Sequence, residues 1–386
     1  MASLSTQSGP SALHLMPEMN STEYPCPLSA NISTKVTVKS TGLAMSCFTM
    51  IFGAISNLAA LGILAKSHIR FRRQAKAPFL LLAGALLLAD LGGHMIPGSF
   101  AMYLHMDHSQ RHKAMMKAAQ PTKVFCQIFG ASMVFFGLCP LLLGGAMAVE
   151  RCVGITQPLL HTAMITVTHI RLAVLLLFSL ALLLAVLPLF NVGTYTTQYP
   201  GTWCFLPIHG PRTVTDTNLA LAFSCLGLLA LTLSLLCNIS SVLALVRSRV
   251  SSKSVKPTST ARCNRRTPSL ATSSSSSFCS LEVEMMAQLA VITVVSCVCW
   301  SPFLFHVVVS VTQFYQSSDA SVHQSGRGIL LGLRMASWNQ ILDPWVYIIL
   351  RRAVLHRVFR ALHTKRSTLR KSSSCADSRR QALSLH

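Results

Sequence analysis

Seven long stretches of the chain are almost entirely apolar, and polar segments separate them. A hydrocarbon core about 30 Å thick takes roughly 20 helical residues to cross, and each stretch is about that long or longer. Backbone groups find no water in lipid, so each stretch is expected to be a helix that satisfies its own hydrogen bonds. The pattern predicts an all-α bundle of seven transmembrane helices, at residues 42–65, 77–104, 123–150, 168–190, 216–246, 283–314 and 326–350.

The polar segments at the two ends of the chain predict further organisation. Residues 1–41 are expected to be an extracellular tail, with sequons for glycosylation at Asn20 and Asn31. After the seventh span, apolar residues at helical spacing lie opposite basic ones, which predicts a short amphipathic membrane-surface helix at 351–363. Residues 364–386 then form a cytoplasmic tail.

Composition agrees with a membrane protein, and the charge pattern predicts its orientation. Apolar residues make up 51% of the 386 positions and charged ones 11%, whereas a soluble chain carries about a quarter charged residues. Most Lys and Arg residues follow the odd-numbered spans. By the positive-inside rule, the N-terminus is expected to be extracellular and the C-terminus cytoplasmic, for a multi-pass protein of the plasma membrane. The net charge of +22 therefore reflects topology rather than nucleic-acid binding, in which basic residues cluster among aromatics on a solvated face.

Residues 42–350 form the transmembrane domain in this interpretation, and one of its loops differs from the rest. The segment 247–281 is rich in Ser, Arg and Lys, so it buries too little apolar area to fold alone. It is expected to be a flexible, phosphorylatable third cytoplasmic loop.

Charged residues within the spans are costly and each needs a reason. Asn57, Asp90 and Asp343 form either a network that holds spans one, two and seven together or a conformational switch. Arg334 lies about two turns outward of Asp343 on the same span, with no obvious acidic partner in the outer halves of the other spans. It either snorkels to the surface or binds an anionic ligand, and its depth favours a carboxylate ligand that matches the guanidinium fork.

Two cysteines of the transmembrane domain stand on the oxidising side of the membrane. Cys126 opens span three, and Cys204 lies in the loop after span four. Such a placement favours a disulfide that ties the loop to the helix. Most other cysteines fall inside apolar stretches, where a thiol behaves as a small hydrophobe.

Three motifs in the spans suggest a conformational change. Glu150 and Arg151 close span three, where an arginine shielded by its neighbouring carboxylate could be released to meet a partner. Proline kinks a helix and leaves a backbone carbonyl unpaired, and two such prolines stand near large aromatics. They are Pro302 in Cys299-Trp300-Ser301-Pro302 and Pro344 in Asp343-Pro344-Trp345-Val346-Tyr347.

Two other classes of membrane protein fit the sequence less well. A transporter of organic anions would show internal repeats and interrupted helices in two halves, whereas the span count is odd. A membrane-embedded enzyme would need a nucleophile with a base, or a metal cluster, at one depth. His94 and Asp90 share a helix face, but no Ser/His/Asp set or metal spacing accompanies them. The sequence predicts no enzyme activity, metal or cofactor, and His94 is interpreted as a packed polar residue.

Together, the seven spans, the cysteine pair and the three motifs resemble the rhodopsin-like G-protein-coupled receptors over roughly residues 42–365. Within that family, the string 198–205 resembles the second extracellular loop of the prostanoid receptors, and 333–344 resembles their seventh helix. Three further strings are most similar to the prostaglandin E2 branch, with the prostaglandin F2α branch as near competitor: 135–143, 147–152 and 296–302.

The resemblance implies a lipid carboxylic acid, prostaglandin E2, as the ligand. It implies that Arg334 pairs with the ligand carboxylate, that Thr202 and Trp203 lie over the ligand, and that Ser337 belongs to the same site. Met133 stands where amine receptors carry an aspartate, which argues against a cationic ligand.

The resemblance leaves the contact from span two open and implies several partners. That contact comes from Tyr103, from His105 or from neither. A heterotrimeric G protein of Gq type, with calcium release, is the implied signalling partner, alongside membrane lipid, arrestin and receptor kinases.

Overall fold

The computed structural model describes residues 30–71, 77–113, 122–208, 212–254, 272–315 and 322–349. The chain divides into two units, residues 1–41 and 42–386. The second unit holds the helical bundle, and the architecture below is that of this unit.

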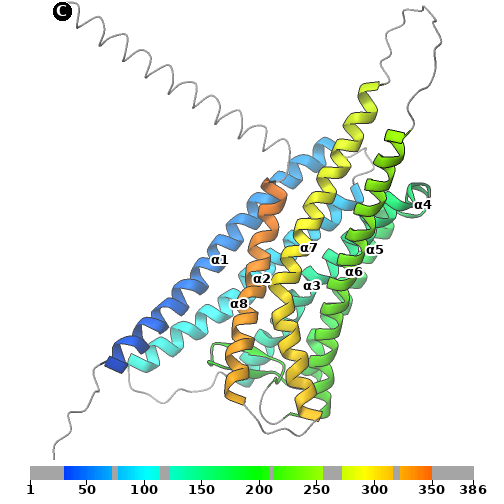
Figure 1. Cartoon of the computed structure of the whole chain (residues 1–386). Coiled ribbons are helices and arrows are strands. Elements are labelled where there is room, and N and C mark those ends of the chain that lie inside the picture. The colour runs from blue at the N-terminus through cyan, green and yellow to red at the C-terminus, as the bar shows by residue number, and fades with distance from the viewer. Residues whose placement is uncertain are drawn as a thin grey trace, which may run out of the picture. The chain divides into compact units, whose positions relative to one another are not determined.

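Seven long helices, one short helix and a small hairpin make up the described part of the chain (Figure 1). The long helices are α1 (Ala30–Phe71), α2 (Ala77–Lys113), α3 (Lys123–Thr156), α5 (Val167–Val186), α6 (Val214–Ser254), α7 (Thr272–Tyr315) and α8 (Val322–Ile349). The shorter elements are α4 (Pro158–Met164), a single 3-10 turn η1 (Leu187–Phe190), and the strands β1 (Thr196–Gln198) and β2 (Trp203–Phe205). The predicted all-α class and the seven-helix bundle are confirmed.

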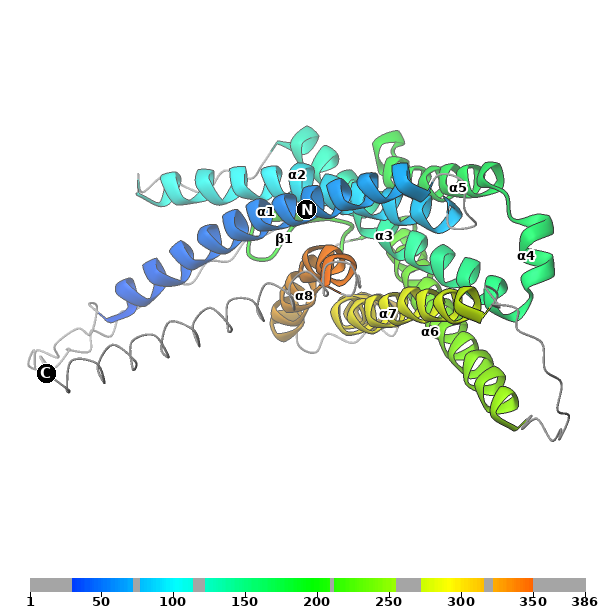
Figure 2. The same cartoon turned by 90° about the horizontal axis from the view of Figure 1, so that it is seen from above.

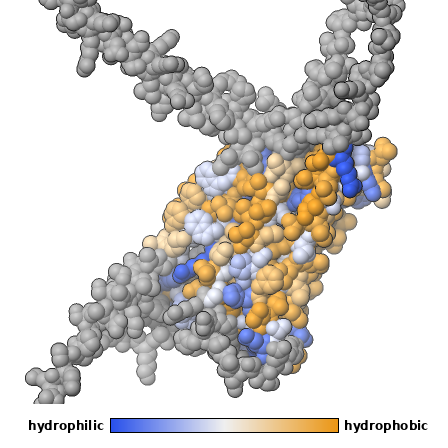
Figure 3. All heavy atoms as spheres, in the orientation of Figure 1, coloured by the Kyte–Doolittle hydropathy of each residue, from blue (hydrophilic) through white to orange (hydrophobic). Residues whose placement is uncertain are grey.

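Six of the described helices are long and apolar enough to cross a membrane, namely α1, α2, α3, α5 with η1, α6 and α7. The seventh long helix, α8, is less apolar because it carries Arg327, Arg334 and Asp343. Hydrophobic side chains cover much of the visible face of the described helices (Figure 3). Such a surface suits lipid rather than water.

The core of the bundle is organised around α3. The membrane-spanning window of α3 is 61% buried, whereas that of α5 is only 17% buried, so α3 is central and α5 peripheral. Helix α3 packs against α2, α5 and α6, and α7 contacts both α6 and α8. The view along the bundle shows α7 beside α8 and α6 (Figure 2).

The structure differs from the predicted spans where local chemistry intervenes. The fourth span reaches residue 190 as predicted, but its α-helix ends at Val186 and the chain continues as η1, because Pro188 cannot donate a backbone hydrogen bond. The predicted loop 247–281 is shorter, since α6 runs on to Ser254 and α7 begins at Thr272. A formed helix extends into polar sequence at little cost, because propagation needs no new nucleus.

Several predictions fall on residues outside the description. The surface helix at 351–363, the tail at 364–386 and the sequon residue Asn20 all lie there. Asn31 is the second residue of α1, and its glycosylation stays a prediction.

Candidate functional site

A covalent bond fixes the hairpin β1–β2 to the start of α3. The strands pair antiparallel, with Thr197 opposite Cys204, and Cys204 is bonded to Cys126. The turn between the strands needs Gly201, whose φ of 95° lies in the left-handed region that glycine adopts without strain. The predicted disulfide is therefore confirmed. We call this end of the bundle the hairpin end.

Polar and aromatic contacts fasten the segment before the hairpin to the bundle. The Tyr195 hydroxyl donates to the carbonyl oxygen of Ala185 in α5 at 2.8 Å, and burial raises the pKa of this phenol. The ring lies so close to α3 that a Cβ on Gly130 would come within 2.4 Å of it. Only glycine leaves room for this approach.

Aromatic rings connect β2 to the interior of the bundle. The Phe205 ring centroid lies 5.2 Å from that of Phe223 on α6 and 5.5 Å from that of Phe303 on α7. Phe303 in turn lies 6.3 Å from Trp300. Edge-to-face contacts of this kind add to the stabilisation from burial alone, so the hairpin is packed onto α6 and α7 as well as bonded to α3.

A cavity of about 220 Å³ lies beneath the hairpin. Its lining comes from α1, α2, α3, α7, α8 and the hairpin turn: Met45, Ser46, Thr49, Met50, Gly93, His94, Pro97, Gly98, Ala101, His105, Phe129, Met133, Phe136, Gly137, Pro200, Thr202, Trp203, Trp300, Leu330, Leu333, Arg334, Ala336, Ser337, Trp338 and Gln340. The lining is mostly apolar, with a few hydroxyl, imidazole and amide groups. This composition is typical of a site for a small amphipathic molecule.

One formal charge lines this cavity. Arg334 contributes it from α8, and none of the lining residues is an aspartate or glutamate. The Ser337 hydroxyl donates to the backbone carbonyl of Arg334 at 2.8 Å. A guanidinium in such a setting attracts an anion, most strongly a carboxylate that accepts two parallel hydrogen bonds.

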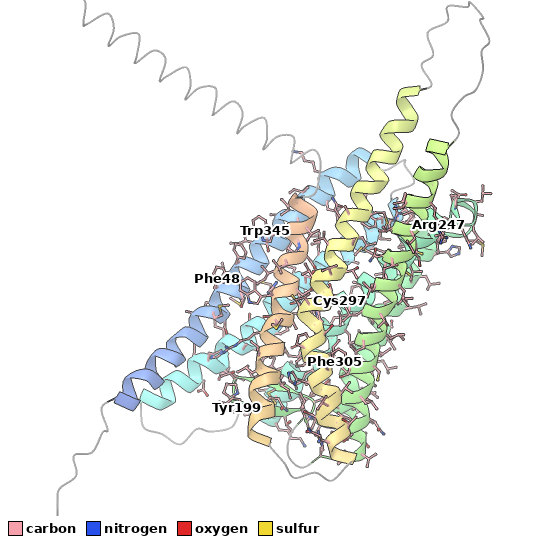
Figure 4. The ribbon with its side chains drawn as sticks, viewed as in Figure 1. Phe48, Tyr199, Arg247, Cys297, Phe305 and Trp345 are labelled. Atoms are coloured by element: carbon pink, nitrogen blue, oxygen red, sulfur yellow. A yellow bond between two sulfur atoms is a disulfide. The ribbon has the colours of Figure 1, made fainter. Side chains whose placement is uncertain are left out.

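The opposite end of α3 carries a compact ion-pair cluster, which we call the Arg151 end. The Arg151 guanidinium bonds both carboxylate oxygens of Glu150 and lies 5.1 Å from the ring centroid of Phe79. His161 on α4 places its Nε2 2.9 Å from the same carboxylate. Tyr199 and Arg247 mark the two ends of the bundle in Figure 4.

Between the two ends lie the buried polar residues of α1, α2 and α8. The Asn57 amide donates to the carbonyl oxygens of Gly53 and Gln340, both at 3.0 Å, and the Asn339 amide donates to Asp343 at 3.0 Å. Within the described residues, neither carboxylate oxygen of Asp90 has a hydrogen-bond partner. Asn57 therefore ties α1 to α8, while Asp90 takes no direct hydrogen-bonding part in the network.

Comparison with known proteins agrees with this arrangement. The model of the rhodopsin-family seven-transmembrane receptors matches residues 62–347. The prostaglandin E2 receptor EP1 subtype of Mus musculus is 43% identical over 351 residues, covering 83% of this chain and 82% of the relative. The chain belongs to the prostanoid receptors of the rhodopsin family.

One further relative and one solved structure are also similar to this receptor. The prostaglandin F2-alpha receptor of Homo sapiens is 38% identical over 343 residues, covering 88% of this chain and 87% of the relative. The crystal structure of squid rhodopsin has a TM-score of 0.62 at 14% identity, covering 84% of this chain and 87% of that one, and shows the shared fold. Membership of this receptor family agrees with the expectation that the chain is not an enzyme.

The structure brings most of the predicted ligand residues together. Six of them line one cavity: His105, Met133, Thr202, Trp203, Arg334 and Ser337. Tyr103 is 59% exposed and packs its ring against Phe125, with the centroids 5.3 Å apart, so it does not line the cavity. The roles of all seven in binding stay predictions.

The predicted switch residues are spread from the cavity to the Arg151 end. Trp300 lines the cavity, and Pro302 and Pro344 lie inside α7 and α8. Tyr347 belongs to α8, but its side chain lies outside the description. Of these residues, Trp300 lies at the cavity itself, and Pro302 follows it two positions later on α7.

Some lining residues were not predicted. His94 was interpreted as a packed polar residue, yet it lines the cavity with its buried Nε2 lacking a partner among the described residues. A four-residue spacing on α2 could have predicted this face of the cavity. The residues at that spacing all line it: Gly93, Pro97, Ala101 and His105. Residues four apart share one helix face, and His94 borders it.

Proposed function

We propose that this receptor binds prostaglandin E2 in the cavity under the hairpin and signals through a G protein of Gq type. The carrying observation is that Arg334 supplies the one formal charge of a mainly apolar cavity. A prostanoid combines a carboxylate with apolar chains, so it fits both features. In this proposal the hairpin end is extracellular and the Arg151 end cytoplasmic, in agreement with the excess of Lys and Arg after odd-numbered spans.

The ligand's carboxylate pairs with Arg334 in this proposal, and its chains lie deeper, towards Met133 and Trp300. Thr202 and Trp203 cover it from the hairpin turn. The cavity of about 220 Å³ is somewhat smaller than the roughly 300–1,000 Å³ of typical ligand sites. Binding therefore requires side chains to move, and contact with Trp300 is the direct route by which such movement reaches α7.

Signalling follows if the ligand binds the active arrangement better than the resting one, because only a difference in affinity shifts the equilibrium. Helices α7 and α8 would shift about Pro302 and Pro344. The Glu150–Arg151 pair would then open and leave Arg151 available to the G protein.

Prostaglandin F2α is the second candidate ligand. The identity of 43% to a prostaglandin E2 receptor of subtype 1, against 38% to a prostaglandin F2α receptor, favours E2 by a small margin. The two ligands share the carboxylate, so Arg334 serves either, and the choice depends on the polar groups deeper in the cavity.

The test compares the ligand acid with its methyl ester in cells that express the wild type or Arg334→Gln at matched surface levels. Calcium release is recorded for prostaglandin E2, prostaglandin F2α and the two esters. A hydrogen bond to a charged group contributes about 1.5–3 kcal/mol, so the wild type should prefer the acid roughly 10- to 150-fold. In Arg334→Gln this preference should vanish.

The matched control is Lys123→Gln, which removes an exposed positive charge at the start of α3 without touching the cavity. It should keep the acid preference. A variant Arg334→Gln that still prefers the acid would refute the carboxylate pairing, and a stronger response to F2α than to E2 would reassign the ligand.

A further inference from the structure

Helices α3 and α6 pack against each other at glycine positions of α3. A Cβ on Gly137 of α3 would lie 3.5 Å from the Phe223 ring of α6, and a Cβ on Gly145 would lie 3.6 Å from the carbonyl oxygen of Ala230. Seven residues make about two helical turns and return to the same face. Seven residues beyond Gly145 and Ala230 stand Cys152 and Cys237.

The two thiols meet as this register requires. The side chains of Cys152 and Cys237 face each other across the two helices, close enough to interact. Both are partly exposed, and neither is in a disulfide. Three other described thiols differ: Cys225 is exposed on α6, Cys139 is buried, and Cys297 lies on α7 (Figure 4). Cys299 also belongs to α7, and the Cys47 thiol on α1 lies 3.5 Å from the sulfur of Met102.

The two thiols lie beside the ion-pair cluster at the Arg151 end of the bundle. Cys152 follows Arg151 directly, at the end of the bundle opposite the bonded cysteines of the hairpin. Cytosolic thiols are normally reduced, and the disulfides that form there are usually transient and redox-sensing. The pairing rests on the α3–α6 register, whereas its regulatory meaning rests on the orientation and signalling of the proposed function.

We propose that Cys152 and Cys237 are a redox modification site, in which a peroxide oxidises the two thiols to a reversible disulfide between α3 and α6. One thiolate attacks a peroxide oxygen and becomes a sulfenic acid, with loss of water when the oxidant is hydrogen peroxide. The second thiol attacks that sulfur and expels a second water. Two thiols and one hydrogen peroxide thus give one disulfide and two waters, and a thiol reductant reverses the bond.

The bond restrains α7, one of the two helices that move in the proposed signalling, by way of α6. It fixes α6 to α3 next to Arg151, and α6 is held to α7 by the hydrogen bond from Asn238 to Thr293 at 2.7 Å. Oxidation therefore couples α3, α6 and α7 in the resting arrangement. G-protein activation should fall roughly fivefold or more, the lower range of allosteric coupling.

The chemical test needs no ligand. The full-length receptor in membranes is treated with hydrogen peroxide, its free thiols are blocked, and peptides are analysed by mass spectrometry before and after reduction. A Cys152–Cys237 linked peptide should form in the wild type and in the control Cys225→Ser, and it should be absent from Cys152→Ser and Cys237→Ser. Oxidation of Cys225 in the wild type without any Cys152–Cys237 link would overturn the proposal.

The functional test measures nucleotide exchange by the G protein, with and without prostaglandin E2. Peroxide should lower exchange in the wild type and in Cys225→Ser, a thiol reductant should restore it, and Cys152→Ser should be insensitive. Linked receptor that exchanges as well as the reduced form would overturn the restraint. Because the linked peptide is read without ligand, failure of the ligand assignment is distinguishable from failure of this site.

Discussion

The two ends of the bundle are held together by different kinds of interaction. At the hairpin end, a disulfide and packed aromatic rings fix β2 to α3, α6 and α7. At the Arg151 end, one carboxylate holds an arginine and a histidine. Covalent and packing contacts hold the backbone of the hairpin in place over the cavity, whereas an ion pair can exchange one partner for another. The comparison indicates that the hairpin end is the more firmly fixed of the two ends.

Removing the disulfide should break this contrast most strongly. In Cys204→Ser the hairpin keeps its ring contacts but loses its bond to Cys126, across a sequence separation of 78 residues. We expect a loss of about 2–4 kcal/mol of stability. Ligand binding at the cell surface should fall with it, because Thr202 and Trp203 are no longer held over the cavity. Radioligand binding at matched surface expression measures the effect, and Cys225→Ser is the control. Unchanged affinity in Cys204→Ser would show that packing alone holds the hairpin.

Asp216 anchors the same end through polar contacts. Its carboxylate accepts hydrogen bonds from the backbone N–H and the hydroxyl of Thr194 and likewise from both groups of Thr213. The variant Asp216→Asn points an amide donor at donors and should cost about 1–3 kcal/mol. The melting temperature of the detergent-solubilised receptor should fall, whereas that of the exposed neighbour variant Thr215→Ala should not. Equal melting temperatures would mean that these four contacts stabilise little.

Some features of the hairpin end and the Arg151 end can be predicted from the sequence, and others cannot. Apolar length is enough to predict the spans, and the positions of Cys126 at the start of one span and Cys204 in a loop on the same side of the membrane favour their bond. The pattern of the sequence does not predict the hairpin strands β1 and β2, because strands of three residues form only once the disulfide and the helices are in place. The same holds for α4, a helix of seven residues whose polar and apolar positions show no clear period.

Two polar residues of the cavity, Arg334 and His94, differ in how far the sequence predicts their place in it. Arg334 was predicted because an intramembrane charge is costly and needs a partner. His94 is equally polar, yet whether it faces a cavity or a packed neighbour depends on how α1 and α2 approach each other. That approach is set by tertiary contacts, such as those around Gly53, where a Cβ would come within 2.3 Å of the His94 ring.

The Arg151 end should give the smallest but most informative effects. Glu150→Gln removes the charge that holds Arg151 and should raise ligand-independent signalling clearly. His161→Ala removes only the second hydrogen-bond partner of the carboxylate, and one hydrogen bond contributes about 0.5–1.5 kcal/mol, so basal signalling should rise roughly tenfold or less. The control Thr162→Ala changes an exposed residue of the same helix α4 and should have no effect. Basal nucleotide exchange in membranes distinguishes these outcomes. If His161→Ala raised exchange as much as Glu150→Gln, the histidine rather than the arginine would be the main partner of Glu150, and α4 would be the element that holds the resting state.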